Sequence, residues 1–319
     1  MGAGMVRFRS MAGQTENTVR SATILVNATA RRVGRFDADG ALAYLRRRGV
    51  EAHLERPDSP EAMIAVAGES AARHYDLLFV AGGDGSLRTV LPAVIGTETA
   101  LAALPAGTAN VWAKETGIPG GFRTAMDAHL RGQRLRIDIG RANGEPFLLM
   151  ASLGWDATIA SRVRPGWKRL LGPLAYVAEG VRQLPRLRPT PLTWRSGAFT
   201  GSAPIAVMVL SNTRLYGGAV RFSPMADATD GLLDLAALSP RRRGDGVILA
   251  WRLVRGGLHS DHRVFDGRAE ELFVETEGVP YQLDGDPAGF SPVRFNVEHR
   301  ALLVSVPAGR LPGVLGSGL

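Results

Sequence analysis

The sequence predicts an α/β fold: an N-terminal doubly wound, mostly parallel sheet domain, a C-terminal antiparallel β-sandwich-like domain, and a cleft between them. In the first part of the chain, apolar runs of strand length alternate with stretches of helix length, as in βαβ units. After residue 132 this pattern gives way to alternating residues and turn signals, which indicate hairpins. The length of 319 residues exceeds the ~100–200 residues usual for one domain, and therefore favours two.

The first domain is expected to contain four strands, at residues 23–26, 50–54, 76–81 and 100–104. The segments between them are long enough for crossover helices, so the strands should run parallel. In such sheets ligands bind at the carboxyl ends of the strands, near the point where the strand order reverses. We therefore look for the functional loops at that edge.

The second domain begins with Leu135, Ile137 and Ile139, which alternate with polar residues up to a turn at residues 142–144, before residues 147–152 resume as strand. Further strands are predicted at residues 205–211, 232–238, 270–275, 293–297 and 302–306. Residues 162–187 are predicted to be an inserted helical stretch and residues 196–202 a loop. The expected boundaries are a flexible leader at 1–20, domains at 21–132 and 133–306, and a mobile tail at 307–319.

Composition excludes several classes of protein. The chain has no cysteine, which excludes disulfides, thiolate metal sites and cysteine nucleophiles. No apolar run approaches the roughly 18 residues that cross a bilayer, so any membrane contact should be peripheral. The net charge of +8 suits an anionic partner such as nucleic acid, phospholipid or nucleotide, although a GC-rich genome could also produce the excess of arginine.

A glycine-rich loop, Gly82-Gly83-Asp84-Gly85-Ser86, directly follows the third predicted strand and opens a helical stretch. Glycines permit positive φ and close backbone approach, so main-chain N–H groups can hold phosphate oxygens. Asp84 could then hold Mg²⁺ through water. The alternative is a tight turn in which Asp84 only caps the helix.

A second loop, residues 105–110, follows the next strand and again opens a helix. Thr108 can donate to a phosphate, and Asn110 can cap the helix or contact a nucleotide. Because neighbouring parallel strands end at the same edge, the two loops should face each other across the switch point. Together they predict a nucleotide site.

With these loops in place the chain resembles the diacylglycerol kinase catalytic-domain family, which includes bacterial lipid kinases and sphingosine kinases. The resemblance spans residues 23–306 and rests on an ordered set of segments, since the first loop alone also occurs in NAD kinases and phosphofructokinases. The set comprises the two loops, residues 113–119, Asp138-Ile139-Gly140, Gly154-Trp155-Asp156-Ala157, residues 224–234 and Asp284-Gly285-Asp286. It implies an ATP site between the two domains and a last segment that returns towards the first.

The resemblance also implies roles for individual residues. The expected ATP contacts are Gly82, Gly83, Asp84, Gly85, Ser86, Leu87, Arg88, Thr89, Gly107, Thr108 and Asn110. Asp84 and Asp138 are expected to organise the catalytic Mg²⁺. A second, structural Mg²⁺ is implied at residues 227–232, through Asp227, Asp230 and Leu232, although such a loop also fits a turn with a capped strand.

The resemblance implies that the catalytic base is Asp284 or Asp286. The family normally has Glu at the third position of this element, and Asp286 shortens the reach of that carboxylate by one methylene. We favour Asp284, because it adjoins the end of a predicted strand and its position is better fixed.

The chain departs from the family pattern at three places. Arg88-Thr89 stand where Asn-Glu is usual, residues 27–30 reduce an early Asn-Pro-x-x-Gly element, and Val111 replaces a frequent Asp. One carboxylate of the usual metal-linked network is therefore missing. These changes either retune the site or mark a weakened kinase that mainly binds lipid or nucleotide.

Two other clusters have competing interpretations. His259, Asp261 and His262 superficially resemble a metal site, but zinc needs three or four convergent ligands, so a solvated turn is favoured. The basic, aromatic-bearing residues 162–176 suit either a lipid interface or an ordinary solvated helix.

The sequence thus predicts a lipid kinase that uses ATP and Mg²⁺ to phosphorylate a diacylglycerol- or sphingoid-like hydroxyl. The expected partners are the lipid substrate and an anionic membrane surface, with no nucleic acid, and a homodimer is left open. The expected location is cytoplasmic and peripherally membrane-associated. The alternatives are an NAD kinase-like enzyme with a soluble substrate and a non-catalytic regulator that binds lipid or nucleotide.

Overall fold

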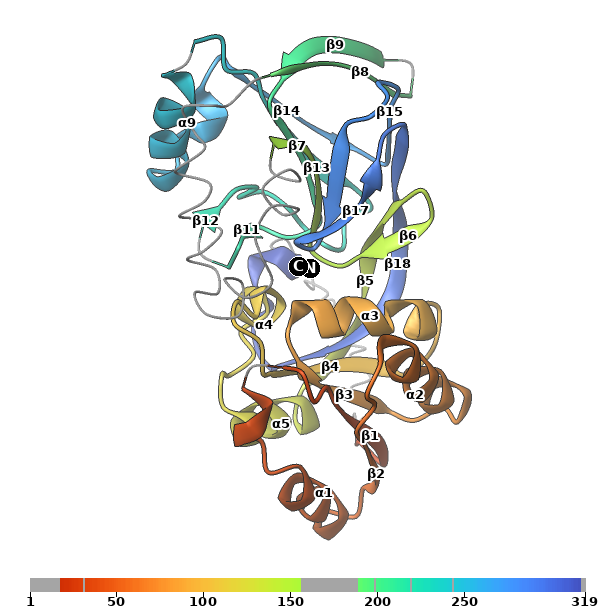
Figure 1. The fold of residues 1–319 in the computed structure, drawn as a ribbon. Helices are drawn as coiled ribbons and strands as arrows, with labels where there is room; N and C mark the ends of the chain where they lie inside the picture. Colours follow the sequence, from red (N-terminus) through yellow and green to blue (C-terminus); the bar gives the residue numbers. More distant parts are fainter. Residues whose placement is uncertain are drawn as a thin grey trace, which may run out of the picture.

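The computed structural model of the chain describes residues 18–30, 32–155, 189–197, 199–218, 220–242 and 244–316. It confirms the predicted fold class: a parallel sheet with helices at the N-terminal end and antiparallel sheets at the C-terminal end (Figure 1). The expected helical stretch at 162–187 and the basic segment at 162–176 lie outside the described residues, as do residues 1–17 of the leader.

The N-terminal part is built on four parallel strands in the order β2-β1-β3-β4. Their bounds are β1 Ser21–Val26, β2 Glu51–Glu55, β3 Leu77–Gly82 and β4 Ala100–Pro105. Every residue of β3 and β4 is buried, as expected of strands covered on both faces. This double burial is why continuous apolar runs revealed these strands in the sequence.

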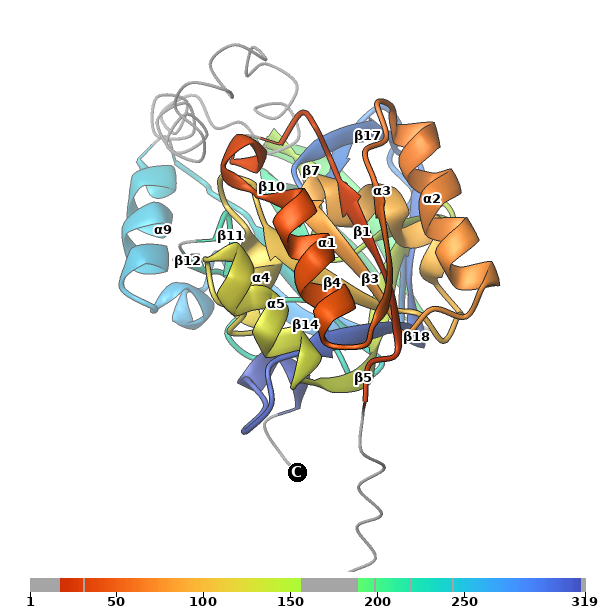
Figure 2. The same cartoon turned by 90° about the horizontal axis from the view of Figure 1, so that it is seen from below.

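Helices cover both faces of this sheet (Figure 2). On one face α2 (Pro60–Ala72) packs against α3 (Asp84–Val94). On the other, α1 (Ala38–Arg47) meets α5 (Phe122–Leu130), where Tyr44 donates a hydrogen bond to Asp127 and the ring centroids of Phe36 and Phe122 lie 4.7 Å apart. A short 3-10 helix, η1 (Val33–Arg35), precedes α1, and α4 (Val111–Glu115) follows the second loop.

One long strand, β18 (Val293–Val306), joins the two halves of the molecule. Its last part lies parallel to β4, and its first part pairs antiparallel with β15 (Glu271–Val274). The register with β5 (Gln133–Ala142) shifts between Glu298 and Leu302, where Arg300 has φ +50°. The strands expected separately at 293–297 and 302–306 are therefore one strand with a bulge.

The same sheet continues through β8 (Thr190–Ser196) and β9 (Phe199–Ile205), while β6 (Glu145–Phe147) pairs with β5. The prediction of a loop at 196–202 is therefore wrong, because these residues end one strand and begin the next. Most side chains of β9 are exposed or half-buried, so the segment shows no apolar periodicity. Ser196 pairs with Phe199 across the turn, where Gly197 has φ +57°.

A second, antiparallel sheet has the order β14-β13-β10-β7-β16-β17. Its strands are β7 Met150–Gly154, β10 Val207–Ser211, β13 Leu233–Leu238, β14 Val264–Ala269, β16 Pro280–Leu283 and β17 Asp286–Phe290. Buried side chains from both sheets form one shared cluster, which includes Phe295 of β18, Leu153 of β7 and Leu272 of β15. The two sheets therefore pack as a sandwich.

The remaining elements flank this sandwich. They are the short pair β11 (Leu215–Tyr216) and β12 (Val220–Arg221), helix α9 (Asp245–Val254), and the 3-10 helices η3 (Leu258–Ser260) and η4 (Gly313–Leu315). The prediction of a mobile tail is wrong for η4, because Val314 and Leu315 are buried and Ala228 N donates to Val314 O at 2.8 Å. Within the described residues, no helix combines the length and apolarity that crossing a bilayer needs.

Candidate functional site

The two glycine-rich loops touch through their backbones at the carboxyl ends of β3 and β4. A Cβ placed on Gly107 would lie 2.5 Å from the Cα of Gly83, and one placed on Gly83 would lie 3.0 Å from the Cα of Gly107. Real Cβ atoms do not approach a backbone so closely. Both positions therefore need glycine because no side chain fits there, and not because of their φ angles. The two loops therefore form one continuous backbone surface, as their positions in the sequence predicted.

Asp84 binds across this junction. Its carboxylate accepts hydrogen bonds from Val111 N at 3.0 Å and Trp112 N at 3.1 Å, the first N–H groups of α4. Burial raises the pKa of Asp84, while these N–H groups and nearby Lys114 oppose the rise. Asp84 thus acts as a cap, but for the helix of the second loop and not for its own helix.

The second loop is closed by its own asparagine. Asn110, at φ +47°, accepts from Gly107 N at 2.9 Å and donates to Gly107 O at 3.0 Å. Thr108 is exposed, and neither its hydroxyl nor its N–H has a partner among the described residues. Of these two expected nucleotide contacts, Thr108 keeps its polar groups exposed and Asn110 holds the loop in shape.

Most side chains of the first loop and its helix are used inside the protein. Ser86 accepts a hydrogen bond from Asn27 Nδ2 at 2.8 Å, Leu87 belongs to the hydrophobic core, and Thr89 Oγ1 donates to Gly85 O at 2.9 Å. The expected nucleotide contacts of this segment are therefore left to its backbone. Sequence reasoning missed the role of Asn27, whose place at the end of the first strand was the available signal.

Arg88 links α3 to the sandwich. Its guanidinium, only 15% exposed, pairs with Glu145 of β6 and lies 3.8 Å from Asp286 Oδ2 of β17. A Cβ on Gly85 would also lie 3.8 Å from that oxygen, so the Asp286 carboxylate faces the first loop. Glu145 was not predicted, because its partner stands 57 residues away in the sequence.

Asp284 and Gly285 form the turn between β16 and β17, with φ values of +51° and +91°, as in a type I′ hairpin. The Asp284 carboxylate accepts from Leu148 N at 2.8 Å, Leu149 N at 2.8 Å and Met150 N at 3.0 Å. Burial raises the pKa of Asp284 to about 6, against the effect of these three donors. Three of about four acceptor positions are thus occupied, which gives Asp284 an organising role. These contacts run against our preference for Asp284 as the base and favour Asp286.

Three of the carboxylates expected to hold Mg²⁺, those of Asp138, Asp227 and Asp230, lie near one another but are engaged in hydrogen bonds. Asp138, fully buried, accepts from Gly231 N at 2.6 Å and Arg300 N at 2.7 Å and lies 2.8 Å from His299 Nδ1. Asp227 accepts from Thr229 N at 3.0 Å. Asp230 accepts from Leu232 N at 3.0 Å and meets Arg268.

These contacts do not fit a prepared metal site. Within the described ranges no group of three or more His, Asp or Glu side chains is arranged to hold a metal ion. Each expected carboxylate in this region instead stabilises a turn or a bulge by accepting backbone N–H groups. Burial raises the pKa of Asp230, and Asp227 and Asp138 raise it further, so negative charge does gather here. His259 Nε2 donates to Phe222 O at 2.7 Å, and Asp261 pairs with Arg263.

An apolar cavity of about 130 Å³ lies between α9 and the second sheet. Leu249 and Leu253 of α9 line one wall and Val207 and Val209 of β10 the other; Tyr216 and Phe222 close it near β11 and β12. The segment that carries β11 and β12 is tied to α4, since Leu215 N donates to Glu115 and Lys114 Nζ donates to Gly218 O at 3.0 Å. The segment at one end of the cavity is therefore tied to the helix that follows the second loop.

Comparison with known proteins matches both halves of the chain. Residues 21–142 match the diacylglycerol kinase catalytic domain, and residues 150–306 match the YegS C-terminal NAD kinase beta sandwich-like domain. A diacylglycerol kinase of Bacillus subtilis is 31% identical over 76% of this chain and 81% of its own length. A "Probable lipid kinase YegS-like" of Pseudomonas aeruginosa is 31% identical over 90% of this chain and 95% of its own length.

The fold is shared with a crystal structure of a diacylglycerol kinase from Bacillus anthracis. The two structures superpose with a TM-score of 0.68 at 16% identity, covering 90% of this chain and 97% of the other. At that identity the likeness establishes the fold alone.

The contact between the loops predicts the effect of Gly107→Ala. The added methyl would overlap the Gly83 backbone, so we expect a loss of about 1–3 kcal/mol in the free energy of unfolding and weaker ATP binding. Urea unfolding and ATP titration measure both quantities. Gly120→Ala is the matched control, because a Cβ there has nothing within 4 Å; equal effects of the two substitutions would contradict the assigned contact.

The cap made by Asp84 predicts that Asp84→Asn destabilises the fold as well as lowering any activity. An amide presents only one acceptor atom to two N–H groups, so one buried donor loses its partner at a cost of about 1–3 kcal/mol. Urea unfolding should show this loss of stability in Asp84→Asn, whereas the control Asp58→Asn, at an exposed position, should leave the stability unchanged. Unchanged stability of Asp84→Asn would remove the capping role.

Proposed function

Because this chain belongs to the diacylglycerol kinase catalytic-domain family, we propose that it transfers the γ-phosphate of ATP to a lipid hydroxyl at a membrane surface. The observation that carries the lipid part of this proposal is the apolar cavity between α9 and the second sheet. Its lining side chains are almost all apolar, which suits an acyl or alkyl chain and not a polar, soluble substrate. Diacylglycerol and a sphingoid base both fit this description.

The two loops supply the phosphate-binding surface in this proposal. The N–H of Gly85 at the start of α3 has no acceptor among the described residues, and Thr108 offers a hydroxyl and an N–H from the facing loop. Both kinds of donor suit phosphate oxygens, and the dipole of α3 favours negative charge at its start. The Mg²⁺ that accompanies ATP as substrate would neutralise phosphate charge.

Asp286 serves as the base in the proposed reaction. It faces the first loop from β17, and it would accept the hydroxyl proton as that oxygen attacks the γ-phosphorus and ADP leaves. Asp284 fixes the turn that carries Asp286, and Arg88 holds the two halves of the site together through Glu145. Phosphoryl transfer asks mainly for such positioning, so few reactive side chains are needed.

One observation favours the second candidate, a non-catalytic regulator that binds lipid or nucleotide. The Arg88 guanidinium lies 3.8 Å from Asp286 Oδ2, so the carboxylate proposed as the base takes part in an ion pair within the protein. Measuring transfer of labelled phosphate from ATP to a panel of lipids separates the two candidates. Transfer to a lipid supports the kinase, and binding of ATP and lipid without transfer supports the regulator.

The two candidate bases should respond differently to amide substitution. We expect Asp286→Asn to lower kcat by about 10²–10⁴ with little change in ATP affinity or stability. Asp284→Asn should instead lower the free energy of unfolding, because it disturbs three buried N–H donors. Steady-state kinetics and urea unfolding of both variants, beside Asp58→Asn, test this. Parent-like turnover in Asp286→Asn would exclude it as the base.

Filling the cavity should discriminate between lipids by chain length. Ala250→Phe places a ring in the cavity, so KM for a long-chain lipid should rise several-fold while a short-chain analogue is less affected. Ile64→Phe, at an exposed position of α2, is the control. Equal effects on both chain lengths would argue against the cavity as the acyl site.

A further inference from the structure

Helix α9 is apolar on two sides. Gly246, Leu249, Ala250 and Leu253 line the cavity beneath it. Val247, Ile248 and Trp251 point outwards and are 54%, 44% and 56% exposed. Their spacing places them together on one outer strip. A surface helix normally turns polar residues to water, so this strip indicates a partner.

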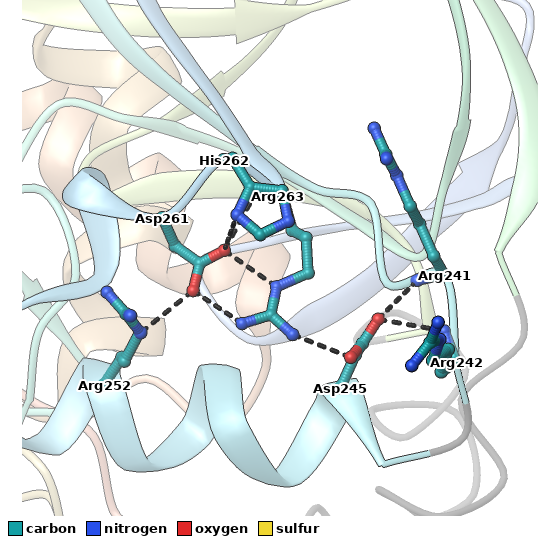
Figure 3. Close-up of polar contacts among 7 residues, drawn as sticks. All are labelled: Arg241, Arg242, Asp245, Arg252, Asp261, His262 and Arg263. Atoms are coloured by element: carbon teal, nitrogen blue, oxygen red, sulfur yellow. Dashed lines mark hydrogen bonds and ion pairs between the residues drawn. The ribbon is translucent and has the colours of Figure 1, made fainter.

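A buried ionic network fixes α9 in this orientation (Figure 3). Arg263 binds Asp261 through two hydrogen bonds of 2.7 Å each, and its third nitrogen lies 2.7 Å from Asp245 at the start of α9. Arg252, on the last turn of the helix, pairs with Asp261 at 2.9 Å. Both ends of α9 are thus tied to the same carboxylate–guanidinium cluster, and the outer strip cannot rotate inwards.

The charges around the strip are positive. Arg241 and Arg242 are exposed. Each donates its backbone N–H to Asp245, at 2.7 and 2.9 Å, and neither uses its side chain in this contact. No ion pair involves their guanidinium groups within the described part of the chain. Arg255 is also exposed and lies over the Trp251 ring at 4.5 Å. The two nearby carboxylates, Asp245 and Asp261, are buried and already bound to Arg263.

We propose that the outer face of α9 docks on an anionic phospholipid bilayer, with Val247, Ile248 and Trp251 inserted and Arg241, Arg242 and Arg255 at the headgroups. Apolar residues flanked by arginine, with an indole at the boundary, are what interfacial helices present. A helix is about 10–12 Å across, so docking would bring the cavity on the inner side of α9 close to the acyl region. This inference names the partner of the proposed function, but its binding test does not use activity.

Co-sedimentation with vesicles tests the docking surface. The protein should bind vesicles of phosphatidylcholine with one third phosphatidylglycerol more tightly than vesicles of phosphatidylcholine alone, and salt should weaken the difference. The double substitution Ile248→Glu with Trp251→Glu should weaken binding at least about tenfold. Arg241→Gln with Arg242→Gln should cost about fivefold per arginine on the anionic vesicles.

The matched control is Ile64→Glu, which introduces the same charge at an exposed position of another helix. Helix α2, which carries Ile64, lies on the far side of the molecule from α9 in both ribbon views (Figures 1 and 2). The Ile64→Glu variant should bind the vesicles as tightly as the parent protein does. Equal binding by the α9 double variant and the parent would overturn the proposal.

Brominated phospholipids test insertion directly, because bromine in the acyl region quenches a nearby indole. Trp251→Phe keeps the apolar strip, so it should still bind vesicles but lose most of the quenching. Full quenching in that variant would show that another tryptophan enters the bilayer and would refute docking by α9.

A second copy of the chain is the other possible occupant, and sedimentation velocity detects it. A dimer that the α9 double variant dissociates, without vesicle binding by the parent, would overturn the proposal. Activity on a monomerically dispersed short-chain lipid should persist in the double variant. If the parent binds vesicles through α9 but phosphorylates no lipid, the docking surface stands and the proposed function fails.

Discussion

The candidate site depends on a contact between two glycines. Because neither Gly83 nor Gly107 has a side chain, the loops after β3 and β4 meet backbone to backbone, and their N–H groups share one surface. Asp84 then reaches from one loop to cap the helix of the other, and Asn110 closes the second loop on Gly107. Each of these polar contacts requires the close approach that the glycines allow. The loop pair is therefore a single unit with a fixed spacing of donors.

The sandwich is aligned with this unit through polar contacts of residues distant in sequence. Asp284 holds the backbone of residues 148–150 to the β16–β17 turn, and Arg88 ties α3 to β6 and β17. Asn212 adds a bridge, since its Nδ2 donates to Asp138 O and Leu148 O at 2.9 Å each. The position of Asp286 opposite the first loop follows from these contacts, together with the continuity of β18.

What the sequence predicted depended on how far apart the interacting residues lie. Strands β3 and β4 and the two loops were predictable, because burial on both faces and local glycines leave continuous signals. The β8–β9 hairpin was missed, since its exposed strands carry no periodic apolar pattern. Asp84 caps a helix that begins 27 positions later in the sequence, and Arg88 pairs with Glu145, which lies 57 positions later. No local sequence pattern encodes such distant pairs. The hydrogen bonds of Asp284 could not be predicted on the same ground, because its three backbone donors come from another strand connection.

The ionic network beside α9 is best explained by the orientation that it gives the helix, and not by a gain in the stability of the fold. Burying Arg263, Asp245 and Asp261 incurs a desolvation penalty that their mutual attraction roughly offsets, so the cluster adds little net stability. Hydrogen bonds from Arg263 hold the pKa of Asp261 well below its ordinary value, which keeps the cluster charged at neutral pH. What the cluster does provide is a fixed orientation for a helix whose inner and outer sides are both apolar. Without that restraint, the hydrophobic effect would favour rotations of α9 that bury Trp251 and expose the lining of the cavity. The network therefore specifies which side of α9 faces outwards, and that choice leaves both the cavity and the outer strip available for apolar ligands.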